Sequence, residues 1–222
     1  MTGDVVAGPD NNARWCDLVC RSHGLATRFV DDLWMSLEGS PPFYPDVVTL
    51  RPSASGADVM AHMRSRVGSV KDSFARLDLA PEGFRVLFDA HWIVHRSPRP
   101  APSALHWAPV DTPHVLDDWT VQAGLEGIIR ADLLTERTIR IFAGRHSDRG
   151  PIVAGAIANA TGRVVGVSNV FSEQPDARAV WQDVQGITAA AFPGRPIVGY
   201  EHGDDLAHAL ESGFSRLQSL RI

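Results

Sequence analysis

The sequence predicts an α/β protein of the α+β type, with a mixed, mostly antiparallel central sheet and flanking helices. First, 222 residues with 44% hydrophobic and 21% charged side chains suffice for one large or two small domains with a real core. Second, every second residue from Phe84 to Val94 is apolar without a break, which is typical of a strand. Third, two apolar runs at 152–159 and 163–171 flank Ala160-Thr161-Gly162, which indicates a hairpin.

The first half contains short elements of both kinds. Trp15, Cys16 and Cys20 share an apolar helix face, on which we expect the two cysteines to be small core residues. The spacing of apolar residues over 29–37 also permits a helix. The expected elements, in chain order, are an unstructured start at 1–11, a helix at 12–22, a strand at 47–50, a helix at 57–67 and an antiparallel strand pair at 69–74 and 84–95.

A proline-rich segment separates the two halves. Pro98, Pro100 and Pro102 alternate with other residues and favour an extended connection. We therefore expect an N-terminal α/β subdomain at 1–97, a linker at 98–104 and a second part at 105–222. The two parts share a weak order of strand, helix and strand pair, so the first could be a degenerate copy of the second.

The second half alternates strands and helices in a defined order. Thr112-Pro113 is typical of a helix start, and Gly124 of a helix end. After the hairpin come a helix, a short strand, another helix and a final strand. The expected ranges are strands at 105–110 and 138–144, the hairpin, helices at 112–122, 176–191 and 204–212, and strands at 196–200 and 215–222.

Composition narrows the classes of function. The net charge is −5 and no run of Lys or Arg occurs, so we expect no nucleic-acid partner. Lys71 is the only lysine. No stretch approaches the about 20 apolar residues of a membrane span, and the N-terminus lacks a signal-peptide pattern. We therefore expect a cytoplasmic protein without a membrane partner, and a homodimer stays open.

The order of elements over 105–222, and best over 150–222, resembles the GNAT acyltransferase family. Its ending, Glu211-Ser212-Gly213-Phe214 before the last strand, is similar to the family's helix, Gly-Phe pair and strand. The resemblance implies acetyl-CoA or another acyl-CoA as co-substrate, a small amine-bearing metabolite as acceptor, and no metal. It further implies that the second hairpin strand diverges from its neighbour, so that Ser168, Asn169, Val170 and Phe171 could pair with the pantetheine arm.

The following loop departs from the family pattern. The resemblance places the pyrophosphate at residues 172–178, where helix N–H groups bind anions. This loop contains no glycine and carries Glu173 and Asp176, which repel phosphate, while Ser172 and Arg178 could bind it. An ordinary capped helix start, with both carboxylates serving the helix dipole, is the alternative interpretation.

The catalytic residues also depart from the pattern. The family's tyrosine falls at Ala209 and its asparagine near His202. Glu201, at the end of a strand beside the expected site, is the first candidate for a general base, and Tyr200 and His202 could act as acid. The alternatives are that Glu201 caps the next helix, that Tyr200 lies in the core and that His202 is solvated.

The first half offers a second polar group. Asp72 lies on one expected strand, and Asp89 and His91 lie on the expected partner strand, so the three could converge on the acceptor side of the cleft. A structural Lys–Asp or Asp–His pair is the alternative. Three interpretations remain open. The first is an acyl-CoA-dependent N-acyltransferase. The second is a protein of the same fold that binds a ligand or partner, or has been adapted to another reaction, and the third is a two-subdomain structural or regulatory protein with no site.

Overall fold

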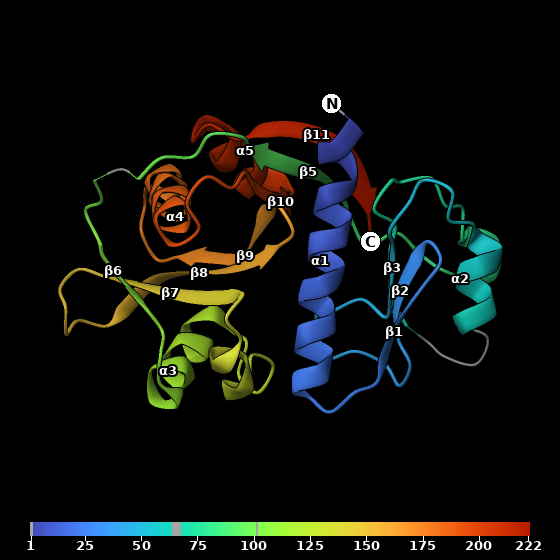
Figure 1. Ribbon diagram of the computed structural model, residues 1–222, viewed down its shortest axis with the longest axis horizontal. Coiled ribbons are helices and arrows are strands. Elements are labelled where there is room, and N and C mark those ends of the chain that lie inside the picture. The colour runs from blue at the N-terminus through green and yellow to red at the C-terminus, as the bar shows by residue number, and fades with distance from the viewer. Residues whose placement is uncertain (1, 64–67, 101) are drawn as a thin grey trace.

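The computed structural model describes residues 2–63, 68–100 and 102–222. Figure 1 shows a large sheet and a small sheet with one long helix between them. The described α-helices are α1 (Thr2–Ser22), α2 (Gly56–Met63), α3 (Pro113–Ala123), α4 (Ala177–Ala191) and α5 (Gly203–Glu211), and single 3-10 turns lie at Ala80–Glu82 and Ala131–Thr135. None of these helices combines the length and the apolar character needed to cross a membrane.

The large sheet has the strand order β11-β5-β10-β9-β8-β7-β6. Neighbouring strands run antiparallel except β9 and β10, which are parallel. The mixed, mostly antiparallel sheet predicted from the sequence is therefore confirmed. Its strands are β5 (Asp89–His95), β6 (His106–Pro109), β7 (Ile139–Arg145), β8 (Ile152–Thr161), β9 (Val164–Ser172), β10 (Ile197–Glu201) and β11 (Ser215–Arg221).

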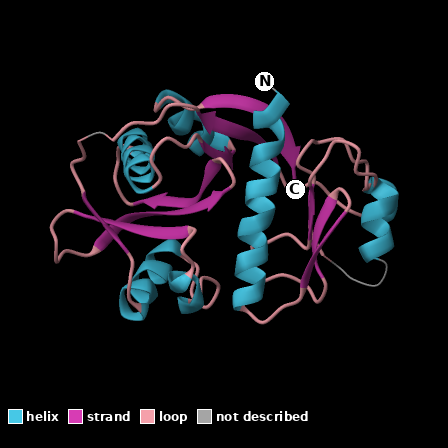
Figure 2. Ribbon diagram, viewed as in Figure 1, coloured by secondary structure: helices cyan, strands magenta, loops and turns pink. Residues whose placement is uncertain are grey.

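Helices cover both faces of the large sheet (Figure 2). On one face, Trp181 and Val184 of α4 and Leu206 of α5 pack on alanine and valine side chains of β8 and β9. On the other face, Trp15 of α1 and Trp119 of α3 belong to a second apolar cluster with isoleucines of β7 and β8. The elements predicted for 105–222 all occur, with ends shifted by a few residues at most.

The small sheet packs on the side of α1 that faces away from the large sheet (Figure 1). Its order is β1-β2-β3-β4, with β1 (Thr27–Val30), β2 (Leu33–Ser36), β3 (Val47–Thr49) and β4 (Val70–Lys71). Cys16 and Cys20 of α1 are buried against Trp34 of β2, and both are free thiols, so the core position predicted for the cysteines is confirmed. The helix thus supplies buried residues to two clusters at once.

The predicted unstructured start at 1–11 is wrong, because α1 begins at Thr2. α1 contacts the large sheet at β8, β9 and β10, and within its first part Asn11 bonds to Asn159 of β8. Gly8 lies so close to Trp92 that a Cβ atom would stand 2.8 Å from the indole. Tertiary packing of this kind stabilises helices whose own propensity is weak.

The helix considered for 29–37 is also wrong. β1 and β2 form an antiparallel hairpin that turns at Asp31, which has a left-handed φ of 48°. All four residues of β2 are buried, so a polar/apolar alternation does not mark this strand.

The predicted antiparallel pairing of 69–74 with 84–95 is wrong. β4 pairs in parallel with β3, and β5 lies between β10 and β11. Residues 84–88 precede β5 and are not part of it. The helix predicted for 57–67 is confirmed over Gly56–Met63, and its last four residues lie outside the described part of the chain.

The predicted linker at 98–104 joins β5 to β6, two strands of the same large sheet. Residues 89–95 of the predicted first subdomain thus complete the sheet formed by the second part. The division of the chain into 1–97 and 105–222 stays a prediction.

Candidate functional site

β9 and β10 pair only near their N-terminal ends and then stop pairing. Their parallel register covers only Ile197 with Val165 and Val198 with Gly166. Beyond that point β9 stays paired with β8 as far as Ser172, while β10 stays paired with β5 as far as Glu201. The divergence predicted for the second hairpin strand is therefore present.

A β-bulge shapes the end of β9. Ser168 pairs with Ile157 and Phe171 with Gly155, so two residues of β9 lie opposite one residue of β8. One of the two, Asn169, has a left-handed φ of 52°. Bulges bend a strand and increase its local twist. The bulge thus lies on the part of β9 that has lost contact with β10.

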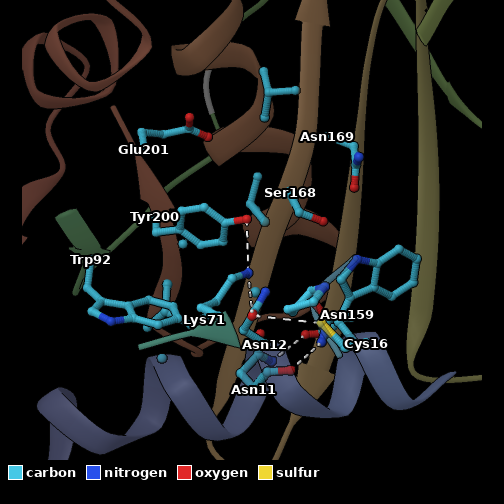
Figure 3. Close-up of a pocket in the computed structure, with 18 of the residues that line it drawn as sticks. Asn11, Asn12, Cys16, Lys71, Trp92, Asn159, Ser168, Asn169, Tyr200 and Glu201 are labelled. Atoms are coloured by element: carbon cyan, nitrogen blue, oxygen red, sulfur yellow. Dashed lines mark hydrogen bonds between the residues drawn. The ribbon is translucent and has the colours of Figure 1, made fainter. Parts of the chain in front are cut away.

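A cavity of about 250 Å³ opens at this separation. Its walls come from α1, the 43–45 segment, β4, β5, β8, β9 and β10. Figure 3 shows the labelled residues that α1 and the five strands contribute. Of the predicted site residues, it brings together Ser168, Asn169, Val170, Tyr200, Glu201 and His202.

The remaining predicted residues do not line this cavity. Phe171 packs edge-on against Trp119, 5.2 Å between ring centroids, and so belongs to the core. Ser172 uses its hydroxyl to accept the N–H of Gln174, and Arg178 is exposed on the first turn of α4.

Lys71 is the principal polar residue of the cavity floor. Its Nζ donates to Asn12 Oδ1 at 2.9 Å and to Tyr200 Oη at 3.0 Å, and it stands 4.1 Å from the centroid of the Tyr200 ring. The side chain is only 2% exposed. This cluster joins the small sheet, α1 and the large sheet.

An asparagine pair fixes α1 beside Lys71. Asn11 Nδ2 donates to the Asn159 carbonyl at 2.9 Å, and Asn159 Nδ2 donates to the Asn11 carbonyl at 3.3 Å. Gly166 of β9 makes room for them, because a Cβ atom there would overlap Asn11 Oδ1. The pair thereby holds α1 in the position in which Asn12 contacts Lys71.

Glu201 is the acidic residue of the cavity. Burial, and to a smaller extent the negative charge of Asp205, raise the pKa of the Glu201 carboxyl from 4.5 to about 8. It does not cap α5, since the N-cap position belongs to His202. A carboxyl group with a pKa near 8 is mostly protonated at pH 7 and can exchange a proton close to neutrality.

The residues on either side of Glu201 differ in burial. Tyr200 is half-buried and meets Trp92 edge-on, 5.5 Å between ring centroids. Because Lys71 donates to its oxygen, the phenol hydrogen is left for another acceptor. His202 is exposed, which agrees with the alternative that it is solvated. Its ring lies against that of Phe88, with 4.6 Å between the ring centroids.

Two further groups characterise the cavity. Ser168 Oγ is buried and has no hydrogen-bond partner in the described structure, which is unusual for a buried hydroxyl. Cys16 also lines the cavity, but burial raises the pKa of its thiol to about 12. Its thiolate form is therefore negligible at neutral pH.

The loop at 172–178 has the structure of a capped helix start. Asp176 is the N-cap of α4, and its carboxylate accepts the Ala179 N–H at 3.0 Å. Glu173 is exposed. For Asp176 the structure thus agrees with the alternative interpretation, in which a carboxylate caps the N-terminus of the helix.

Asp72, Asp89 and His91 do not line this cavity, and each of their side chains has partners of its own. Asp72 is buried, and its carboxylate accepts backbone N–H groups of residues 74, 76 and 77. Asp89 pairs with Arg221 at 2.9 Å, and His91 Nε2 lies 3.3 Å from Ser219 Oγ. The predicted strand pairing is wrong here, because Asp72 meets β11 at Arg221, and not β5.

Sequence reasoning missed Lys71 and the asparagines as members of the site. Lys71 stands out because it is the only lysine and lies between Val70 and Asp72 in a buried strand. Asn11 falls in the segment that was expected to be unstructured and Asn12 at its boundary, whereas Asn159 ends a predicted strand. Among the described residues, no group of three or more His, Cys, Asp or Glu side chains could hold a metal ion.

Comparisons with known proteins identify the fold. No family model and no curated protein matches the sequence. A GCN5-related N-acetyltransferase from Kribbella flavida superposes with a TM-score of 0.63 at 14% identity, over 94% of this chain and 93% of its own. A GCN5-related N-acetyltransferase-like protein from Streptococcus suis gives 0.53 at 14% identity, over 100% and 98%.

The chain therefore has the GNAT fold, as the resemblance predicted. The match extends beyond residues 105–222 to nearly the whole chain, including the small sheet and α1.

Proposed function

We propose that this protein is a cytoplasmic, acyl-CoA-dependent N-acyltransferase that acts on a small amine-bearing metabolite. The observation that carries the proposal is the opening between β9 and β10, which contains a carboxyl group with a pKa near neutrality. The fold supports the same class of reaction. Acetyl-CoA or another acyl-CoA would be the co-substrate.

The separated end of β9 would receive the pantetheine arm. Residues 167–170 follow the last β9–β10 pair, so β10 no longer pairs with this part of the strand. Backbone groups at such an edge bind an extended ligand as an added strand would. Ser168 Oγ, buried without a partner, offers one further hydrogen bond to the acyl or amide groups.

Glu201 would serve as the general base. Its carboxylate accepts a proton from the ammonium group of the acceptor, and the free amine then attacks the thioester carbon. The C–N bond forms, the C–S bond breaks, and the phenol of Tyr200 gives its proton to the departing thiolate. The nitrogen's remaining surplus proton and the proton held by Glu201 pass to solvent, and from solvent Tyr200 is reprotonated.

The cavity favours direct transfer over an acyl-enzyme. A covalent route needs a nucleophile, and Cys16 is the thiol within reach of the cavity. Because burial keeps that thiol protonated, its nucleophilicity is low. We therefore expect kinetics in which both substrates bind before either product leaves.

A second function is supported by the 172–178 loop. Asp176 already occupies the N-terminus of α4, where an anion would bind, and no glycine lets the backbone wrap a phosphate. Ala209 is buried at the place of the family tyrosine. A protein of this fold that binds a ligand without transferring an acyl group is the alternative.

Calorimetric titration with acetyl-CoA and longer acyl-CoAs separates the two functions. We expect micromolar binding that weakens in Arg178→Glu, because the exposed Arg178 is the cation on the first turn of α4. Arg163→Glu, the same charge change in the exposed hairpin turn at the far end of β9, is the matched control. Absence of binding by every acyl-CoA would exclude the transferase.

A further inference from the structure

Lys71 carries a buried positive charge that no carboxylate neutralises. The side chain is 2% exposed, and among the described residues no carboxylate oxygen lies within 4 Å of Nζ, whose hydrogen-bond partners are the neutral Asn12 and Tyr200. Moving an ammonium group out of water without a counter-ion costs several kcal/mol. Buried charges in proteins are therefore usually paired.

Lys71 also has an unused donor. An ammonium group carries three N–H bonds, and Asn12 Oδ1 and Tyr200 Oη accept two of them. The group lies in the wall of the 250 Å³ cavity, so the third hydrogen is available to a ligand there. A ligand oxygen with negative charge would satisfy both the hydrogen bond and the charge.

The cavity's own acid does not supply this charge. Glu201 is mostly protonated at pH 7, because burial raises its pKa to about 8. Cys16 stays protonated for the same reason. At neutral pH neither of these two groups therefore supplies a full negative charge beside Lys71.

The cavity combines this cation with aromatic walls. Trp15, Phe88 and Trp92 line it, and the Trp92 indole nitrogen is already bonded to the Ser73 carbonyl, so the ring offers an apolar surface. Pockets for drug-sized ligands have volumes of about 300–1,000 Å³. The volume of this cavity, about 250 Å³, lies slightly below that range and fits a small metabolite. Figure 3 shows Lys71 and Glu201 on either side of Tyr200.

We propose that Lys71 binds a carboxylate of the acceptor, so that the substrate is a small amino acid with an apolar side chain and not a simple amine. Its amino group would point toward Glu201, and its apolar part would lie on the aromatic walls. The assignment of this ligand as acceptor rests on the proposed function, whereas the carboxylate site itself rests on Lys71 alone.

A matched ligand pair tests the site without acyl-CoA. In calorimetric titrations, 3-phenylpropionate and its neutral amide differ at one group only. We expect the wild type to bind the carboxylate about 10- to 100-fold more tightly, the range for a charge-assisted hydrogen bond. Lys71→Met should remove this difference, while Lys71→Arg, which keeps the charge, should retain most of it.

The comparison of the two ligands on the wild-type protein decides the question even if Lys71→Met fails to fold. Equal or tighter binding of the amide, or no binding of the carboxylate at millimolar concentration, would overturn the proposal. Transfer assays with L-phenylalanine and phenethylamine then distinguish the two ideas. Preference for phenethylamine keeps the transferase and rejects the amino-acid acceptor, whereas carboxylate binding without any transfer rejects the transferase and keeps the Lys71 site.

Discussion

Glu201 is held in a state that costs the folded protein stability. Its pKa is raised from 4.5 to about 8, so the folded protein binds this proton more tightly than the unfolded chain does. Below pH 4.5 both states are protonated and the effect vanishes. As the pH rises from 4.5 through 8, the unfolded chain ionises first, and the folded state loses stability relative to it.

Glu201→Gln should therefore stabilise the protein in a pH-dependent way. Glutamine resembles the protonated carboxyl group and does not ionise. We expect free energies of unfolding similar to the wild type at pH 4.5, and a gain of about 2 to 5 kcal/mol at pH 9, from chemical denaturation. Acyl transfer should fall at the same time, because the base is lost.

The matched control is Glu211→Gln, the same substitution at an exposed position at the end of α5. It should change the stability little at either pH. A gain for Glu201→Gln that is equal at pH 4.5 and pH 9 would contradict burial of the charge as the cause.

At the scale of single residues, the sequence predicted those cavity residues that lie near the ends of predicted strands. Ser168, Asn169, Val170 and the 200–202 segment line the cavity because the order of elements fixes where β9 and β10 end. Lys71 was assigned to a different strand pair, since its neighbours come from α1 and β10, 59 and 129 residues away along the chain. Side chains that meet through long-range packing leave no local pattern.

At the scale of elements, α4 shows how a helix cap competes with a ligand. The Asp176 carboxylate accepts the Ala179 N–H, one of the groups that would otherwise bind a phosphate. Asn is an equally good N-cap residue but carries no charge. The position thus allows the cap and the charge to be separated experimentally.

Asp176→Asn should strengthen acyl-CoA binding while keeping the helix. Removing one negative charge beside the expected pyrophosphate is worth about 0.3 to 1 kcal/mol, or about a 2- to 5-fold lower Kd at low salt. The gain should shrink at high salt because exposed charges are screened. An unchanged Kd at low salt would place the phosphates away from α4.

The small sheet shows which elements a local pattern misses. β2 is buried throughout, so it has no alternating pattern, and its apolar residues also fit a helix. The strand predicted at 47–50 is confirmed, because β3 covers Val47–Thr49. By contrast, the hairpin of β8 and β9 and the capped starts of α3 and α4 were predicted correctly, because glycine, proline and capping residues mark their ends.

At the scale of the whole molecule, β5 ties the two halves of the sequence together. It lies between β10 and β11, pairs with both, and contributes Trp92, Ile93 and Val94, which are nearly inaccessible to water. Without β5, the paired edges of β10 and β11 would face a gap, and their backbone groups would lose their partners.

A fragment of residues 98–222 should therefore not fold alone. We expect it to aggregate or to lack a cooperative thermal transition by circular dichroism, since edge strands with exposed apolar residues associate readily. Co-expression with a fragment of residues 1–97 should restore a soluble one-to-one complex, because the cut lies in the connection between β5 and β6 and leaves every strand of the large sheet whole. The pair of fragments is the matched control for the cut itself. A monomeric 98–222 fragment that unfolds cooperatively would instead establish two independent subdomains, and would mean that β5 contributes little to the stability of the sheet it completes.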